Sequence, residues 1–102
     1  MAAKSFIAVS RGETIGKAFS NAMNNAIREY GNYGFTGTIA EKDSFVLIDY
    51  KKEKKEGESE REFCMRLTDE GDPRIENKWG PAGCIESVKN PGLFIFFGWA
   101  YN

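Results

Sequence analysis

The most regular pattern of apolar and polar positions in the chain predicts one long amphipathic helix. Between residues 15 and 30, apolar side chains recur at intervals of three and four, the spacing that gathers side chains on one face of an α-helix. This stripe consists of Ile15, Ala18, Phe19, Ala22, Met23, Ala26, Ile27 and Tyr30. Ser10 and Glu13 have the spacing of a capping box before the helix, and Gly31 is suited to end it. We expect the stripe to pack against a sheet.

Shorter β-prone runs supply the strands of that sheet. Residues 5–10 form a first predicted strand before the helix. Residues 35–41 and 45–50 predict a hairpin that turns at Lys42 and Asp43. In this register, Phe35, Gly37 and Ile39 share a face with Tyr50, Ile48 and Val46.

The charged segment 51–60 predicts a second hairpin, with a disordered linker as the alternative. It divides into a Lys-rich half before Gly57 and a Glu-rich half after it, so a turn there pairs opposite charges across two strands. The same register aligns residues 45–50 with 61–67 and sets Ile48 opposite Met65. The expected result is a three-stranded meander with a charged hairpin tip at 51–60.

The meander has one apolar face, which we expect under the helix, and one mixed face. The mixed face includes Phe45, Leu47, Cys64 and Arg66. It is neither polar enough for an ordinary solvated face nor apolar enough for a core. We therefore regard these four residues as candidates for contact with a partner or ligand.

Turn and capping residues divide the last third of the chain. Asp72 before a proline predicts the start of a short helical segment, which must end by residue 81. Residues 84–88 and 93–99 predict a closing hairpin around the turn at 90–92. The second arm does not alternate, so we expect it to be buried on both faces and central in the sheet.

These elements predict a single α+β domain over residues 1–102. Its sheet should be antiparallel or mixed, with about five to six strands. The long amphipathic helix should pack on one face, accompanied by the short second helical segment. The content of 41% hydrophobic and 14% aromatic residues is sufficient for one packed core.

Charge and targeting signals narrow the classes of partner. Fourteen basic residues against fifteen acidic residues leave a net charge of -1, so no long-range field favours nucleic acid. The basic-Gly-aromatic octamer of RNA-binding sheets is also missing. The first residues lack the apolar run of a signal peptide, and no stretch is long enough for a membrane span. We expect a cytoplasmic protein with no membrane partner.

The absence of histidine is the most informative feature of the composition. Histidine is the side chain most used for proton transfer near neutral pH and is the commonest metal ligand. Catalytic triads, HExxH sites and zinc fingers are therefore excluded, and we expect no cofactor and no metal. Cys64 and Cys84 do not form a CxxC pair, so reduced, buried thiols are expected, with a single bridge as the alternative.

A glycine-rich turn near Trp79 and Cys84 is a second candidate site. Together with Trp99, these residues predict an aromatic pocket for a small molecule, whereas a plain connection from helix to strand is the structural alternative. The residues show no recognisable catalytic constellation, so we do not expect an enzyme. The expected function is a non-enzymatic binding module or small regulatory protein that contacts another protein. The alternative is a protein that binds a metabolite or nucleotide.

Overall fold

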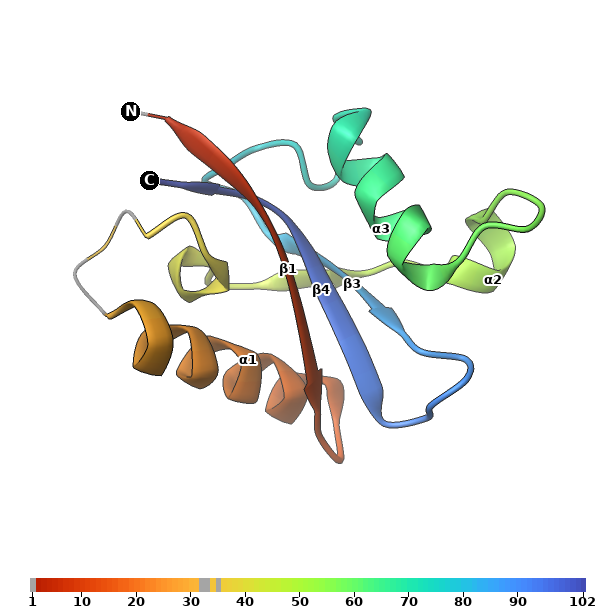
Figure 1. Ribbon diagram of the computed structural model, residues 1–102, viewed down its shortest axis with the longest axis horizontal. Coiled ribbons are helices and arrows are strands. Elements are labelled where there is room, and N and C mark those ends of the chain that lie inside the picture. The colour runs from red at the N-terminus through yellow and green to blue at the C-terminus, as the bar shows by residue number, and fades with distance from the viewer. Residues whose placement is uncertain (1, 32–33, 35) are drawn as a thin grey trace.

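A mixed sheet separates two groups of helices in the computed structural model, which describes residues 2–31, 34 and 36–102 (Figure 1). Within these residues the sheet has four strands, in the order β1-β4-β3-β2. The strands are β1 (Ala3–Arg11), β2 (Phe45–Leu47), β3 (Ala82–Glu86) and β4 (Leu93–Tyr101). β4 is antiparallel to both β1 and β3, whereas β2 is parallel to β3. The described residues thus form one α+β domain, as predicted, but with fewer strands than expected.

Helices cover both faces of the sheet, and not one face as predicted. The helical elements are α1 (Ile15–Tyr30), the 3-10 turn η1 (Ile39–Glu41), α2 (Tyr50–Glu53) and α3 (Glu60–Asp69). Figure 1 shows α1 on one side of the strands and α3 on the other, with α2 beyond the end of α3. None of the helices in the described part of the chain is long and apolar enough to cross a bilayer.

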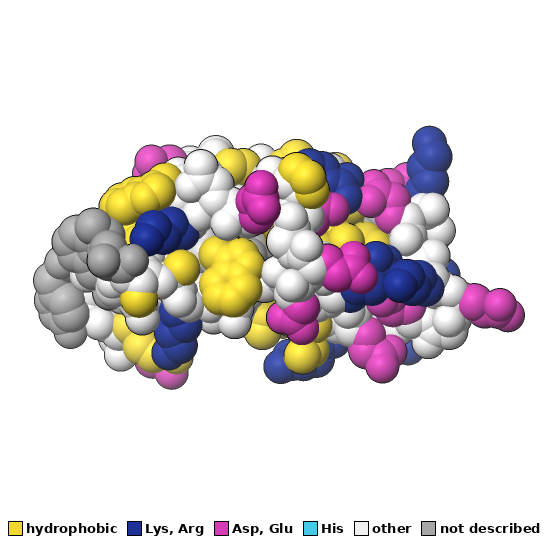
Figure 2. Space-filling model, turned by 90° about the horizontal axis from the view of Figure 1, so that it is seen from above, with side chains coloured by type: hydrophobic (Ala, Val, Ile, Leu, Met, Phe, Trp, Pro, Cys, Tyr) yellow, Lys and Arg dark blue, Asp and Glu magenta, His cyan; other side chains and the backbone are white. Residues whose placement is uncertain are grey.

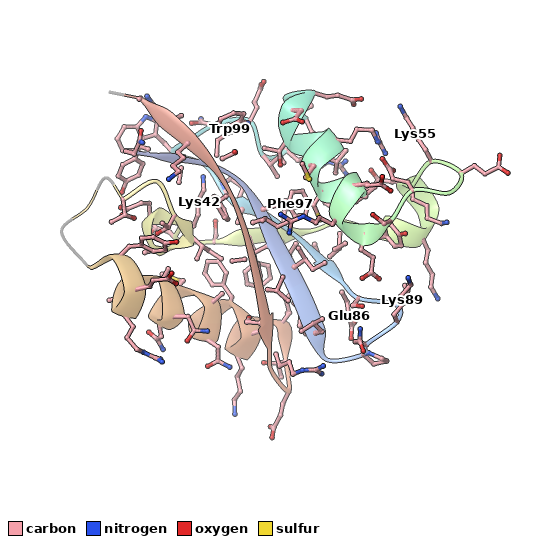
Figure 3. The ribbon with its side chains drawn as sticks, viewed as in Figure 1. Lys42, Lys55, Glu86, Lys89, Phe97 and Trp99 are labelled. Atoms are coloured by element: carbon pink, nitrogen blue, oxygen red, sulfur yellow. The ribbon has the colours of Figure 1, made fainter. Side chains whose placement is uncertain are left out.

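The central position of β4 explains its unbroken apolar sequence. Phe94 and Phe96 belong to the core cluster beneath α1, whereas Ile95 and Phe97 belong to the cluster beneath α3. Figure 3 shows Phe97 extending from β4 toward α3. The predictions of a central last strand and of a closing hairpin with β3 are confirmed. The turn of this hairpin is closed by the Leu93 N–H, which donates to the Asn90 carbonyl at 3.0 Å.

The long helix lies where its periodicity places it, although its first turn is capped differently. Thr14, not Ser10, is the N-cap, and its hydroxyl accepts from the Lys17 N–H at 3.2 Å. Ser10 lies within β1 instead, and its hydroxyl donates to the Ala18 carbonyl. Gly31 ends the helix with φ of 91°, a conformation that glycine adopts without strain. The predicted C-terminus is therefore confirmed and the predicted capping box is wrong.

The predicted meander is wrong because residues 60–69 form helix α3 and not a strand. Ser59 and Glu62 make a reciprocal capping box at its N-terminus, with hydrogen bonds of 2.9 and 3.1 Å. Its buried residues are spaced for one helical face. They are Phe63, Cys64, Leu67 and Thr68. Segment 51–60 is accordingly not a hairpin tip but the end of α2, a turn at Gly57 and the start of α3.

Two other predicted elements also take different forms. The predicted strand 35–41 begins at Phe35, which lies outside the described residues, and its last part is η1. The backbone of Ile48 donates to the Cys84 carbonyl at 2.8 Å, so this residue extends the pairing of β2 with β3 and does not pair with Met65. Residues 72–80 form successive turns, where a short helical segment was predicted.

Candidate functional site

The four residues predicted on a mixed sheet face do not share a surface. Phe45 packs in the α1-side core, with its ring centroid 5.0 Å from that of Phe19. Cys64 lies on the buried face of α3, in the core on the opposite side of the sheet. Leu47 is 62% exposed on the short strand β2. Arg66 projects from α3 and is occupied by ion pairs with Glu58 and Glu70.

The two cysteines are free thiols on opposite sides of the sheet. Cys84 belongs to the α1-side core cluster and Cys64 to the α3-side cluster. Burial raises the pKa of Cys84 to about 12 and raises the pKa of Cys64 further. Both thiols therefore stay protonated near neutral pH, when only a thiolate is a competent nucleophile.

The predicted aromatic pocket is also divided by the fold. Trp79 is 57% exposed and stacks on Tyr101 with ring centroids 4.1 Å apart. The indole N–H of Trp99 donates to the carbonyl of Thr68 at 3.0 Å, on the α3 side. Cys84 is enclosed under α1. The three residues do not line a common cavity among the grooves described below.

The open edge of the sheet at β1 is the feature best suited to hold a partner. The pairing of β1 with β4 is framed by hydrogen bonds from Asn102 N–H to the Ala2 carbonyl and from Gly12 N–H to the Gly92 carbonyl. In an antiparallel ladder, every second residue makes main-chain hydrogen bonds to the neighbouring strand. The residues between them direct their N–H and C=O groups away from that strand. The continuous register therefore turns the N–H and C=O groups of the odd-numbered residues away from β4. These residues are Ala3, Ser5, Ile7, Val9 and Arg11.

Most of these outward groups have no partner within the described part of the chain. The carbonyl of Arg11 accepts from the side chain of Asn21 at 2.8 Å. The main-chain groups of Ser5, Ile7 and Val9 make no hydrogen bond among those found in the same residues. A row of free donors and acceptors on a strand is a template for pairing with a further strand.

This edge also lacks the devices that usually protect an edge strand. Proteins blunt such edges with short strands, proline, bulges or charged side chains. β1 runs for nine residues in unbroken one-to-one register with β4, so it has no bulge. It contains no proline, and its charged residues, Lys4 and Arg11, lie near its two ends. The opposite edge, β2, is only three residues long.

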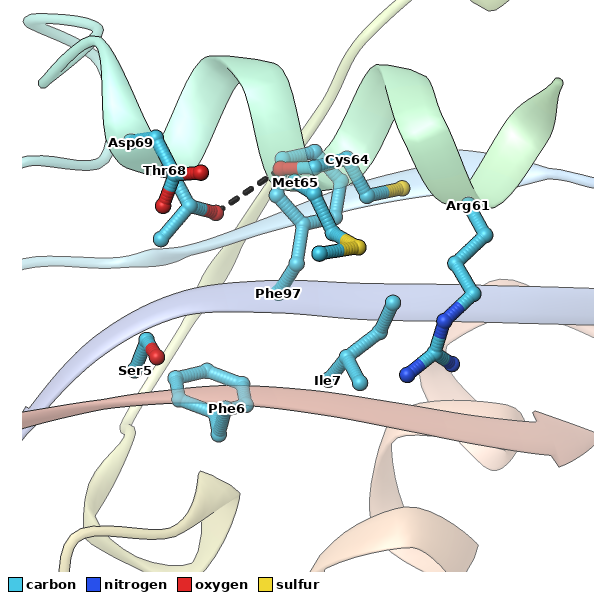
Figure 4. Close-up of a pocket in the computed structure, with 9 residues that line it drawn as sticks. All are labelled: Ser5, Phe6, Ile7, Arg61, Cys64, Met65, Thr68, Asp69 and Phe97. Atoms are coloured by element: carbon cyan, nitrogen blue, oxygen red, sulfur yellow. Dashed lines mark hydrogen bonds between the residues drawn. The ribbon is translucent and has the colours of Figure 1, made fainter.

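Two grooves border the β1 edge, one on each face of the sheet. The groove beside α3 has a volume of about 180 Å³ and includes Ile7 and Met65 (Figure 4). The groove beside α1 has a volume of about 320 Å³ and includes Val9 and Tyr30. Val9, Tyr30 and Met65 are 51%, 50% and 48% exposed, respectively. Exposed apolar side chains therefore flank the row of free main-chain groups on both sides.

Two unpaired charges lie at opposite ends of the α3-side groove. Figure 4 shows Arg61 beside Ile7 at one end and Asp69 on the Ser5 side at the other. Neither side chain has an ion pair or hydrogen bond within the described residues, whereas Arg66 and Arg74 both do. Many other charges gather around α2 and the turn that follows it, away from this groove (Figure 2). Arg61 and Asp69 are thus free to contact a partner at the β1 edge.

The sequence predicted a strand at residues 5–10 but gave no reason to select it as a site. The available signal was the absence of charge between Lys4 and Arg11 in a run of β-prone residues. That signal suits a buried strand equally well, because only long-range pairing decides which strand is at the edge.

Comparison of this chain with protein-family models, with curated proteins and with solved structures gives no match. A function therefore has to follow from the geometry described above.

Proposed function

We propose that this chain is a non-enzymatic binding module, or small regulatory protein, that recognises another protein by strand addition at β1. The observation that carries the proposal is the nine-residue edge whose outward main-chain groups at Ser5, Ile7 and Val9 are unpaired and unprotected. An extended segment of a partner would continue the sheet there and satisfy these groups. Strand addition is a recurring mode of peptide recognition.

The two grooves supply the side-chain contacts that such a mode requires. Successive side chains of an added strand point to opposite faces of the sheet. Alternate side chains would enter the groove beside α1 and the groove beside α3, where Tyr30 and Met65 offer apolar surface. Main-chain hydrogen bonds would provide affinity, and the two grooves would provide selectivity.

The chemistry of the described residues also supports recognition over turnover. The chain contains no histidine, and burial raises the pKa values of both thiols. Most residues that line the grooves beside β1 are uncharged, and each groove has two charged side chains, Arg61 and Asp69 beside α3 and Lys4 and Glu29 beside α1. Such a surface suits a peptide more than a reacting substrate.

The proposal is tested by selecting binding peptides from a displayed random library with the purified protein. Selected peptides should perturb the amide resonances of Ser5, Ile7 and Val9 and slow their hydrogen exchange. Val9→Lys places a charge on the edge and should weaken binding at least about tenfold, or 1.4 kcal/mol. Leu47→Lys is the matched control, because Leu47 is similarly exposed on the opposite edge.

Two results would contradict this function. The first is a set of peptides that perturb other residues and bind Val9→Lys as well as the native protein. The second is a metabolite or nucleotide that raises the melting temperature of the native protein and that of Val9→Lys equally, because a ligand that binds only the folded state stabilises it. That second result would favour the small-molecule alternative.

A further inference from the structure

The β1 edge is complementary to itself, and we propose that it pairs with β1 of a second copy of this chain in a two-fold symmetric dimer. This inference rests on the proposed function, because it identifies the extended strand that occupies the same edge. The sheet would then be continuous across both copies. A second copy fits this edge because the register, the side chains and the free charges all match under one symmetry operation.

The hydrogen-bonding pattern selects the register of the pair. Antiparallel strands bond only where outward-facing residues of both chains meet, and in β1 these are the odd-numbered residues. A two-fold axis at Ile7 satisfies this condition and pairs β1 along its whole length. Ser5 then lies opposite Val9 of the second copy, and Ile7 lies opposite its own equivalent.

Side chains on the α1 face fit the same register. Phe6 and Ala8 both pack toward the α1-side core, and the axis at Ile7 sets Phe6 opposite Ala8 of the second copy. A large side chain thus meets a small one, and this match occurs twice by symmetry. Lys4 lies opposite Ser10 of the second copy, so like charges do not face each other directly across the strands.

The free charges on α3 provide an independent match. Figure 4 shows α3 running opposite to β1, with Arg61 near Ile7 toward the C-terminal end of β1 and Asp69 on the Ser5 side. Rotation about Ile7 exchanges these two ends. Arg61 of each copy is therefore brought toward Asp69 of the other, and both are unpaired within the described residues. The dimer would contain this attraction twice.

The same arrangement buries apolar surface and limits the assembly to two copies. Val9, Tyr30 and Met65 border the edge, so a second copy would cover side chains that are half exposed in one chain. Pairing β1 with β1 uses the open edge of both copies. The remaining edges are the short β2 strands, so growth into a filament is not favoured.

The first test is sedimentation equilibrium of the full chain over a wide concentration range, together with an NMR sample that mixes labelled and unlabelled protein. We expect a monomer–dimer equilibrium. We also expect a cross-copy contact between the Hα atoms of Phe6 and Ala8, because residues in non-hydrogen-bonded pairs bring their Cα atoms closest.

Charge exchange on α3 tests the predicted contact between copies. Arg61→Asp or Asp69→Arg alone should weaken the dimer about tenfold, because two attractive pairs become repulsive, and the double variant should restore it. Both single changes place favourable charges at the ends of α3, so they do not threaten the fold of the monomer. Lys89→Asp, on the exposed β3–β4 turn, is the control and should leave the dimer unchanged.

The outcomes separate this inference from the proposed function. A protein that remains monomeric at every concentration, while its peptides still depend on Val9, overturns the dimer and leaves strand addition intact. A dimer that is indifferent to Val9→Lys and to charge exchange lies on another surface and also overturns the inference. A dimer that responds to both, in a protein that selects no peptide, supports the inference and contradicts recognition of another protein.

Discussion

Arg66 of α3 holds Glu58 through two hydrogen bonds, from Nε to Oε2 at 2.7 Å and from Nη2 to Oε1 at 3.0 Å. Glu58 also accepts from the backbone N–H of Lys55 at 3.0 Å. The pair therefore fastens the turn between α2 and α3 to the helix that follows it. The sequence suggested Arg66 as a contact for a partner, but in the fold Arg66 holds the turn between α2 and α3.

The Glu58 pair predicts acid sensitivity. The hydrogen bond from Arg66, assisted by that from Lys55, lowers the pKa of Glu58 to about 2 from an ordinary value near 4.5. A carboxylate with a lowered pKa in the folded state stabilises the fold above its unfolded pKa, and this contribution is lost as the pH falls. Glu58→Gln should be less stable than the native protein at pH 7, and the difference should shrink between about pH 4.5 and pH 2. Urea unfolding across this range measures the effect, with the exposed Glu56→Gln as control.

The aromatic contacts of Phe19 predict a large loss of stability on truncation. Its ring centroid lies 5.0 Å from that of Phe45 and 5.4 Å from that of Phe96, in the core between α1 and the sheet. Phe19→Ala should cost about 3 to 5 kcal/mol, because a large buried aromatic leaves a cavity. Val88→Ala, at an exposed position, should change the free energy of unfolding by less than about 1 kcal/mol. Similar losses for the two variants in chemical denaturation would contradict the packing described.

A buried lysine supports the loop that carries Trp79. The Lys42 ammonium group donates to the carbonyls of Asn77, Lys78 and Gly80 at 3.4, 3.2 and 2.9 Å, respectively. Lys42→Met keeps the apolar stem but removes these bonds, so it should destabilise the protein by about 2 to 3 kcal/mol and change the Trp fluorescence. Lys89→Met should do neither, because Lys89 is exposed on the β3–β4 turn (Figure 3).

Substitution of two glycines by alanine should change the stability of the protein in opposite directions. A Cβ on Gly83 of β3 would lie 2.7 Å from the ring of Phe97, too close for a packed core. Gly83→Ala should therefore destabilise the protein by about 1 to 3 kcal/mol through overpacking. A Cβ on Gly16 of α1 would meet its nearest neighbour at 4.0 Å, so Gly16→Ala should stabilise by about 0.5 to 1 kcal/mol. Melting temperatures of the two variants on opposite sides of the native value would agree with this description.

The buried thiols predict slow modification of the native protein. Cys64 and Cys84 are fully enclosed, and burial raises the pKa of each. Both should react with a thiol reagent at pH 8 far more slowly in the native protein than in denaturant, because reaction requires exposure and a thiolate. Mass spectrometry after timed quenching measures the two rates. Rapid labelling of either cysteine under native conditions would show that its cluster opens readily.

Helix α3 shows how the sequence admitted two interpretations of one segment. Phe63, Met65 and Leu67 alternate as in a strand, whereas Phe63, Cys64 and Leu67 are spaced as on a helix. In the fold, Cys64 is buried and Met65 is 48% exposed, which is the helical solution. The Lys-rich and Glu-rich halves of segment 51–60 favoured the wrong solution, although the Ser59 and Glu62 capping box was present in the sequence as a signal for a helix.

Local patterns determined the elements whose shape depends on nearby residues. The stripe of α1 and its end at Gly31, the strand within β1, and the β3–β4 hairpin with its turn at Asn90 were all predicted from the sequence and are present. The sequence of β4, which is apolar on both faces of the strand, also determined its central position in the sheet, because such a strand must be covered on both faces.

Only the tertiary structure decided which elements meet and which edge stays open. The parallel pairing of β2 with β3 and the packing of α3 opposite α1 join segments that are distant in sequence, and no local preference specifies such contacts. The outward groups of Ser5, Ile7 and Val9 become a site because no other strand of the described chain pairs with that side of β1. An edge is a property of the whole sheet, so residues that look like an ordinary core strand in sequence become a surface only when the sheet is complete.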